Sequence, residues 1–386
     1  LDNVKFSASS TTLIALHAPA PRLQLLFDRL SKFSSANIGC LSAPVSSRYP
    51  ISLSLLNIPS SIEHRIWRST IPGKERAQVG RWYSQEQIKR EKDDQATRWS
   101  PNSSLDAARI GTLPPTLQDL VNTKQLLSGL LFFTDDASQG LSASLNHHFP
   151  ETAKASNHLH LLGLFASSTP FITGRPFTLF ESESIHSDGA VGVAIVGPKP
   201  LEIESNFSSL MHIGGSLLIT SASSNMIYTM NERPAADTLA QLIETQFNAS
   251  SANRPAVHLG VLDDQEKIYR VFSVLAGSPS RGALLLDGEK SPMVGSKAQF
   301  LVSSREIMDY DENFPSPSAK ETSTLDAQFA CVSYAEANTG HTMTHDSEVT
   351  IIENQFLVAS ENGLLIDKGK GLWECKVPFV GASIKL

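Results

Sequence analysis

The sequence has little cysteine: three residues, Cys40, Cys331 and Cys375, in a chain of 386. Because they are odd in number and far apart, they offer neither a disulfide framework nor a CxxC metal knuckle. This usage is typical of a protein that stays in a reducing compartment.

Long apolar runs and an excess of positive charge are also missing. The longest apolar stretches, such as Ala190–Val196, fall far short of the ~20 residues that span a bilayer. The net charge of −7 argues against a dedicated binder of nucleic acid or of anionic membranes. Any basic surface must therefore be local.

The common catalytic signatures do not occur. There is no GxSxG elbow, no P-loop, no GxGxxG after a first strand and no HExxH, so the usual signals of hydrolases, nucleotide-binding proteins and zinc proteases fail. The sequence gives catalysis no motif, and we expect a protein that is not an enzyme.

What is present indicates a globular protein of two domains. Hydrophobic residues make up 41% and charged residues 18%, which is in the ordinary globular range. A chain of 386 residues is too long for one typical core.

A strand-helix-strand pattern opens the chain. Thr12–Pro19 predicts a buried strand, Pro21–Phe33 places leucines at helical spacing, and Asn37–Ala43 predicts a second strand that ends in small residues. The pattern therefore predicts one strand-helix-strand unit near the N-terminus.

The same order returns twice, the second time more loosely. Gly129–Thr134, a helix from about Ser138 to His148, and Leu159–Ser167 form the second unit. Near the end, Gln328–Ser333 is followed by a similar stretch at Val377–Ser383. We expect an α+β fold that contains these strand-helix-strand quasi-repeats.

Each repeat ends on a glycine followed by small residues, at Gly39, Gly163 and Gly381. A glycine lets the backbone approach closely either a neighbouring strand or a ligand. Close strand packing is the commoner explanation for a single site, but three similar sites indicate a shared cleft. The candidate ligand-binding residues are Gly39, Cys40, Ser42, Gly163, Ser167, Cys331, Gly381 and Ser383.

Cys40 is also the candidate for a reactive thiol, with Ser42 beside it as an alternative nucleophile. Nothing nearby in the sequence would lower the pKa of Cys40, so a buried, inert thiol is the preferred interpretation.

A basic segment separates the first two units. Arg65–Arg98 holds nine Lys or Arg against five Asp or Glu, and we expect an insertion over residues 65–115 with a short helix from Ser84 to about Asp94. One hypothesis is a solvated insertion whose tryptophans fold back onto the body; the other is an arm that docks a protein or touches RNA. The candidate docking residues are Trp67, Arg68, Arg81, Trp82, Arg98 and Trp99.

The rest of the chain predicts mainly strands. Ala190–Val196 follows an Asp-Gly turn signal, a hairpin is expected between Ser216–Thr220 and Asn225–Met230, and a helix is expected after Arg233-Pro234. Four further strands are predicted at His258–Leu262, Tyr269–Leu275, Ala283–Asp287 and Ala298–Ser303.

Two groups of histidines are candidate metal ligands, and one loop is a candidate anion site. His147, His148, His158 and His160 lie close in sequence, as do His341 and His345, but such histidines usually make only solvent contacts and hydrogen bonds, so no metal is assigned. The loop Gly277–Gly282, with Arg281, has the composition of an anion cradle, yet an ordinary turn is the preferred interpretation.

Several stretches, in order along the chain, resemble the FIST family. Leu210–Leu239 resembles the junction between its two modules, FIST_N and FIST_C. Ile38–Ala43 (I-G-C-L-S-A) and Asp188–Ile195 (D-G-A-V-G-V-A-I) are similar to FIST_N motifs. Similarity to FIST_C motifs follows at Arg270–Val274, Met293–Glu306, Phe329–Tyr334 and Val377–Ile384.

The resemblance implies a FIST_N-like module at residues 1–233 and a FIST_C-like module at residues 234–386, similar to the FIST part of F-box proteins but without an F-box. For fold, it implies two α+β modules built from mixed sheets with flanking helices. For function, it implies a sensory or small-ligand-binding role, with amino acids often proposed; the cofactor is unknown. We expect the cleft between the two modules to be lined by the glycine-ended strands. The alternative is an adaptor that docks a protein or RNA through residues 65–98.

Location is predicted from the cysteines, the missing membrane segment and a first residue, Leu1, that is not methionine. These features favour a reducing interior. We place the mitochondrial matrix marginally ahead of the cytoplasm, because removal of a presequence would leave such an N-terminus.

Overall fold

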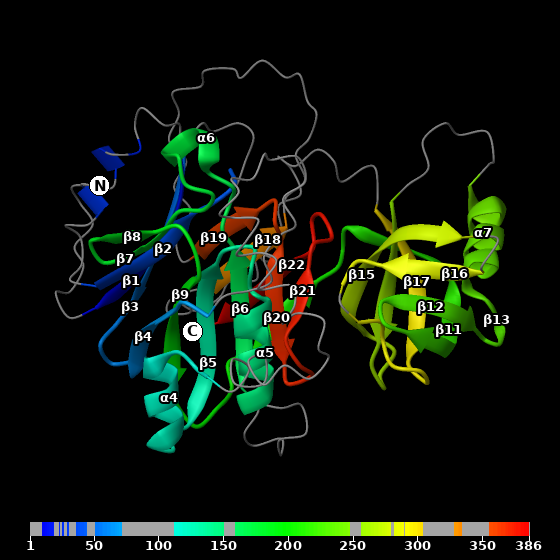
Figure 1. Ribbon diagram of the computed structural model, residues 1–386, viewed down its shortest axis with the longest axis horizontal. Helices are drawn as coiled ribbons and strands as arrows, with labels where there is room; N and C mark the ends of the chain where they lie inside the picture. The colour runs from blue at the N-terminus through cyan, green and yellow to red at the C-terminus, as the bar shows by residue number, and fades with distance from the viewer. Residues whose placement is uncertain are drawn as a thin grey trace, which may run out of the picture.

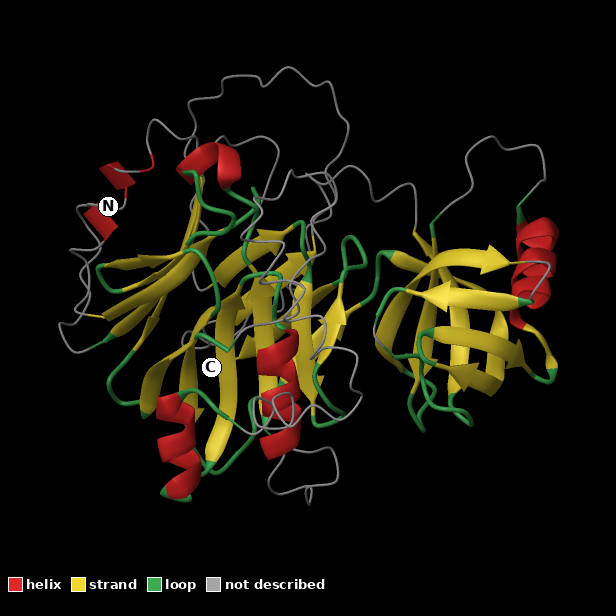
Figure 2. Ribbon diagram, in the orientation of Figure 1, coloured by secondary structure: helices red, strands yellow, loops and turns green. Residues whose placement is uncertain are grey.

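The structure is a computed structural model of an α+β protein, built from several mixed and antiparallel sheets with few helices (Figures 1 and 2). It describes residues 10–18, 23, 25–26, 29–30, 36–44, 51–71, 112–149, 159–247, 256–278, 282–288, 290–303, 328–333 and 355–385. Of residues 328–333 and 355 it describes the backbone alone.

The first sheet contains the first predicted unit. Its strand order is β3-β1-β2-β7-β8, and β1 and β2 lie parallel with Thr11 opposite Ala36. The other neighbours in this sheet pair antiparallel. The strands are β1 (Thr11–His17), β2 (Ala36–Leu41), β3 (Ser52–Ile58), β7 (Leu179–Glu181) and β8 (Ser184–His186).

The second sheet contains the second predicted unit and has six strands, one more than the first sheet. Its order is β21-β20-β6-β5-β9-β4, with β5 parallel to β6 and antiparallel pairs elsewhere. Its strands are β4 (His64–Ser69), β5 (Leu127–Thr134), β6 (His160–Phe165), β9 (Ala190–Val196), β20 (Leu364–Lys368) and β21 (Trp373–Cys375). The second predicted unit is confirmed, including its helix α5 (Gln139–His148).

The third sheet corrects the prediction for the last repeat. Its order is β10-β22-β18-β19, from β10 (Ile203–Asn206), β22 (Gly381–Lys385), β18 (Gln328–Ser333) and β19 (Gln355–Ser360). The parallel partner of β18 is β19, whereas the expected partner stretch contributes β22, which runs antiparallel to β18. The pattern of glycine-ended strands does not predict β19, because the sequence of β19, Q-F-L-V-A-S, holds no glycine.

Residues 210–303 form a closed sheet. Six antiparallel strands follow the order β11-β17-β14-β15-β16-β12, and pairing between β11 and β12 closes the ring, with the short β13 beside β12. The strands are β11 (Leu210–Ser223), β12 (Met226–Met230), β13 (Arg233–Pro234), β14 (Val257–Leu262), β15 (Ile268–Ser278), β16 (Ala283–Leu286) and β17 (Lys297–Ser303). The predicted hairpin and the four predicted strands are confirmed. This closed sheet lies on the right in Figure 1.

Helix α7 (Ala235–Gln246) packs on the closed sheet, as its apolar spacing predicts. Leu239 is buried, and Leu242 and Ile243 pack against the same core. Strands on both sides of residue 233 belong to the closed sheet, because β11 pairs with β17 and β12 with β16. The division of the chain into modules at residue 233 stays a prediction.

The first two sheets face each other across the largest hydrophobic core. Leu13 and Ile38 from the first sheet pack in one cluster with Leu131 and Leu162 from the second and with Phe356 from the third. The outer face of the second sheet is covered by α4 (Pro115–Asn122) and α5. On the outer face of the first sheet, Leu23 and Leu30 of the predicted first helix are helical and buried.

In the described residues, no helix combines the length and the apolar character needed to cross a membrane.

Candidate ligand-binding site

Four strand ends, those of β1, β2, β6 and β19, meet at one place. The backbone N–H of Ser42, just after β2, donates to Leu16 O at the end of β1, and Ser167 N, just after β6, donates to Leu41 O. Ala43 N donates to Ala359 O in β19 over 2.9 Å. The carboxyl ends of strands from all three mixed sheets are therefore tied together by main-chain hydrogen bonds.

A pocket of about 150 Å³ lies where these ends meet. In α/β sheets, the carboxyl ends of parallel strands are the usual place for a ligand. The pocket is lined by Leu16, His17, Ala18, Leu41, Ser42, Ala43, Pro44, Ser167, Ser168, Thr169, Ile172 and Glu361.

Glu361 supplies the carboxylate of this pocket and is held by three donors, of which the most distant, Asn362 Nδ2, donates to Glu361 Oε1 over 3.4 Å. Ser167 Oγ donates to Glu361 Oε2 over 2.7 Å, and Ser168 N donates to Glu361 Oε1 over 2.7 Å. The carboxylate follows β19 in a turn that closes at Gly363, whose φ is +94° and whose Cβ, if present, would lie 2.2 Å from Cys375 O. Only glycine fits there, so the turn that presents Glu361 depends on Gly363.

His17 lies on the other side of the pocket, at the end of β1. Its Nδ1 lies 3.2 Å from the carbonyl oxygen of Ser42. A carbonyl only accepts, so Nδ1 carries the proton and Nε2 of the neutral ring is an acceptor. Burial lowers the pKa of His17, while the hydrogen bond to Ser42 and the charge of Glu361 oppose that shift.

Two of the sequence-predicted ligand residues reach this pocket. Ser42 and Ser167 line it together although 125 positions separate them, because the ends of β2 and β6 are hydrogen-bonded. Their role in binding stays a prediction.

Gly39 and Gly163 do not reach the pocket; they sit inside strands where only glycine fits. A Cβ on Gly39 would lie 1.9 Å from Ile14 O and 2.4 Å from the Phe180 ring, and one on Gly163 would lie 2.4 Å from the Phe132 ring. The alternative interpretation, close strand packing, therefore explains both glycines.

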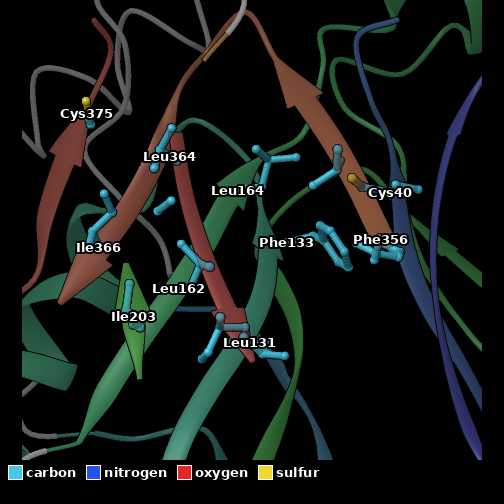
Figure 3. Packing of buried hydrophobic residues seen from close by; sticks show 14 of the residues in the cluster. Cys40, Leu131, Phe133, Leu162, Leu164, Ile203, Phe356, Leu364, Ile366 and Cys375 are labelled. Carbon is cyan, nitrogen blue, oxygen red and sulfur yellow. The ribbon is translucent and has the colours of Figure 1, made fainter. Parts of the chain in front are cut away.

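Cys40 is fully buried in the largest core, next to Phe133 and Phe356 in Figure 3. Burial raises its pKa well above the usual value, and the charge of Glu361 acts in the same direction. Its side chain points into the core because Cys40 alternates with Gly39 and Leu41 along β2. A ligand or reagent cannot reach the Cys40 thiol in this structure. Its surroundings agree with the preferred interpretation, a buried and inert thiol.

The candidates near the C-terminus lie in the third sheet. Gly381 is buried and pairs with Asn206 and Val332, and Ser383 pairs with Glu204 and Ala330. Cys331 lies in β18, where only the backbone is described. None of these three lines the pocket.

Among the docking candidates, Trp67 needs a correction. It lies in β4, inside the second sheet, and its side chain is 1% exposed. Its ring packs against Phe132 with centroids 5.7 Å apart. A partner cannot reach a side chain buried in this way, so Trp67 is a core residue.

Arg68 is half-buried and lies 3.5 Å from Asp188 Oδ1 through its Nη2. The strand β4 shows that residues 64–69 belong to the body of the protein and not to an insertion. Arg81, Trp82, Arg98 and Trp99 lie outside the described residues, as does the helix expected from Ser84 to Asp94. Docking through that segment stays a prediction.

The described histidines near the second unit contact different partners. His147 and His148 stack edge to face at 5.2 Å, and His160 Nδ1 donates to Leu201 O. Within the described ranges, no three His, Cys, Asp or Glu side chains come together in a way that would hold a metal ion. His158, His341, His345 and Arg281 lie outside those ranges.

Comparison with protein families places the chain. The family model described as FIST, FIST N domain, matches residues 37–233, just over half of its length. The chain belongs to the FIST family. The matched segment contains Ser42 and Ser167, so most of the pocket of this FIST protein lies inside the family's domain.

No curated protein and no solved structure matches this FIST protein. The resemblance of residues beyond 233 to FIST_C, and to F-box proteins, stays a prediction. Glu361, which lies beyond the matched segment, is the charged residue of the pocket that sequence reasoning missed. The signal available was the polar run Ser360-Glu361-Asn362-Gly363 directly after the apolar Phe356–Ala359.

Proposed function

We propose that this FIST protein is a non-catalytic module that binds one small polar ligand in the pocket at the strand ends. The observation that carries the proposal is the convergence of Ser42, Ser167 and Glu361, from three separate strand ends, on one cavity. Membership of the FIST family, for which a sensory or ligand-binding role is generally proposed, supports it.

The size of the cavity sets the size of the ligand. A closed apolar cavity of about this volume in another protein holds benzene, and the pocket here, which is partly open to solvent, holds about 150 Å³. The ligand is therefore a small metabolite or a small group of a larger molecule.

The arrangement of the polar side chains favours binding over catalysis. A serine nucleophile needs its hydroxyl hydrogen-bonded to a base, but His17 engages the carbonyl of Ser42 instead of its hydroxyl. Cys40, the other candidate nucleophile, is buried and its pKa is raised. The pocket is thus arranged to hold a molecule.

The proposal is tested with a thermal-shift screen of small metabolites, amino acids and amines included. A ligand at a hundred times its dissociation constant stabilises the folded state by about 2.7 kcal/mol. Ile172 lines the pocket and is half-buried, so Ile172→Trp fills the cavity and should abolish the shift.

Phe171→Trp is the matched control, because Phe171 is the neighbouring residue and is fully exposed. It should keep the shift. The proposal fails if no compound stabilises the wild type, or if stabilisation by a hit survives Ile172→Trp.

The predicted location, the mitochondrial matrix marginally ahead of the cytoplasm, stays a proposal. The sequence upstream of Leu1 in the full-length protein tests it: an Arg- and Ser-rich, acid-poor leader would support import. A folded domain there would overturn it.

A further inference from the structure

Among the described residues, the carboxylate of Glu361 has no lysine or arginine partner. Its three hydrogen-bond donors, the Ser167 hydroxyl, the Ser168 N–H and the Asn362 side-chain amide, are all neutral. Within the described ranges, no lysine or arginine forms an ion pair with it, and none lines the pocket. An ionised carboxylate has about four acceptor positions, so with three donors in place about one position, on Oε2, remains for a donor on a ligand.

Five described main-chain donors around the pocket are already used. The N–H groups of Ser42, Ala43, Ser167 and Thr169 donate to Leu16 O, Ala359 O, Leu41 O and Pro176 O, respectively. Ser168 N donates to Glu361 itself. Among the described residues, the N–H groups just named are therefore not free to cradle a carboxylate or phosphate.

The donors on the described polar side chains of the pocket are also largely in use. The Nδ1–H of His17 is used on Ser42 O, which leaves an Nε2 acceptor, and Thr169 Oγ1 donates to Arg175 O over 3.1 Å. The Ser42 hydroxyl either donates or accepts. The described polar groups of the pocket therefore combine one negative charge with an excess of acceptors.

The remaining wall is apolar. Leu16, Leu41, Ile172, Ala18 and Pro44 line it, and the cavity holds about 150 Å³. An organic cation with a short aliphatic part fits these walls better than a bare metal ion does, since a metal ion would have to leave apolar surface around it unfilled.

We propose that the pocket selects a small primary ammonium ion that carries no anionic group, and that Glu361 binds its charge. The ammonium group donates to Glu361, while its short alkyl part packs against the leucines and Ile172. This inference rests on the proposed function and adds to it the chemical class of the ligand.

Isothermal titration calorimetry with isosteric probes tests the inference on the wild-type protein at constant ionic strength. The probes are propylammonium chloride, 1-propanol, sodium propionate and potassium chloride. We expect propylammonium to bind at least about tenfold more tightly than each of the others, because a charge-assisted hydrogen bond is worth about that much. Equal or tighter binding of 1-propanol, propionate or potassium would overturn the inference.

Two variants locate the charge that matters. Glu361→Gln should weaken propylammonium binding by at least about tenfold. Glu374→Gln is the matched control, because Glu374 also accepts a serine hydrogen bond, from Ser138 Oγ over 2.9 Å, but does not line the pocket. Unchanged affinity in Glu361→Gln would contradict the role of Glu361, and the probe series on the wild type stands even if this variant does not fold.

The results also separate this inference from the proposed function. If 1-propanol or propionate binds and Ile172→Trp removes that binding, the pocket is a ligand site but not one for cations. If no probe binds and no metabolite stabilises the protein, both proposals fail.

Discussion

The middle and the end of the parallel strands differ in what their small residues do. In the middle of β2 and β6, Gly39 and Gly163 make room for Ile14 O, Phe180 and Phe132. A few residues later, Ser42 and Ser167 line a pocket. Small residues inside a strand here serve packing, whereas small polar residues just beyond the strand end leave a hollow with hydrogen-bonding groups around it.

Replacing Gly39 by alanine tests the packing half of this comparison and should have the largest effect. The new Cβ would lie 1.9 Å from a backbone oxygen, which no side-chain rotation relieves. We expect a loss of about 3 kcal/mol in the free energy of unfolding, at the upper end for overpacking, measured by urea titration.

The control is Gly215→Ala in β11, where nothing lies within 4 Å of the new Cβ. Its effect should stay within about 0.5 kcal/mol, as for other surface substitutions. Equal losses at the two positions would contradict the packing role of Gly39.

Two histidines extend the comparison to charge. His258 lies inside β14 and is 2% exposed, with Ser303 Oγ 3.0 Å from its Nε2, whereas His17 lies at the end of β1 and is half-buried. Burial lowers the pKa of His258 to about 4, and burial also lowers the pKa of His17. A buried, neutral histidine makes the folded state sensitive to acid.

The lowered pKa of His258 predicts that the protein loses stability in acid. Between pH 6.5 and about 4 the unfolded chain protonates His258 but the folded one does not, so stability is full above pH 6.5 and falls as the pH drops. The expected contribution is about 3 kcal/mol. Unfolding titrations at pH 7 and pH 4.5 should show a smaller loss in His258→Gln than in the wild type.

His212, which lies in the same closed sheet and is exposed, provides the control. His212→Gln should keep the wild-type pH dependence. If His258→Gln also keeps it, burial of His258 is not the cause.

Ser167→Ala tests the strand-end half of the comparison with a smaller change. The variant loses the hydrogen bond to Glu361 Oε2, but Ser168 N still holds Oε1. We expect ligand affinity to fall about fivefold, because one hydrogen bond contributes about 1 kcal/mol. The free energy of unfolding should change little.

Ser138→Ala removes the corresponding hydrogen bond to Glu374, outside the pocket, and should leave affinity unchanged. Calorimetry with the tightest ligand from the screen measures both variants. An equal loss of affinity in the two would show that neither serine acts through the pocket.

The smallest effect is expected at Cys40, where alkylation should do nothing in the folded protein. Cys40 and Cys375 are both buried, and burial raises the pKa of Cys375 to about 12. In a Cys331→Ser background, mass spectrometry should find neither thiol labelled while the unfolded chain labels fully. Rapid labelling of Cys40 would show that the middle of β2 is accessible after all.

Much of the fold follows from local pattern. The strand Ala190–Val196 is bounded as predicted, and α5 and α7 lie where helical spacing places them. Apolar runs bounded by turn residues decide such elements locally. The short strands β7, β8 and β21 were missed, because three residues carry too little pattern to distinguish a strand from a loop.

The candidate site was predictable only in part, because it depends on contacts between distant segments. Ser42 and Ser167 carry a local signal, since both follow an apolar strand that contains a glycine. Glu361 carries none of that kind, and its place beside Ser167 depends on the pairing of β20 with β6. Trp67 was misinterpreted because its charged neighbours hide the buried alternation of β4.

Backbone amide chemical shifts measured by NMR during a titration with propylammonium test the central claim most directly, since they report where a ligand binds. The account predicts that the largest changes fall on the strand ends, at Ser42, Ser168 and Thr169, and leave Gly260 in the closed sheet unmoved. Largest changes within residues 210–303, with Ser42 and Ser168 unaffected, would contradict it.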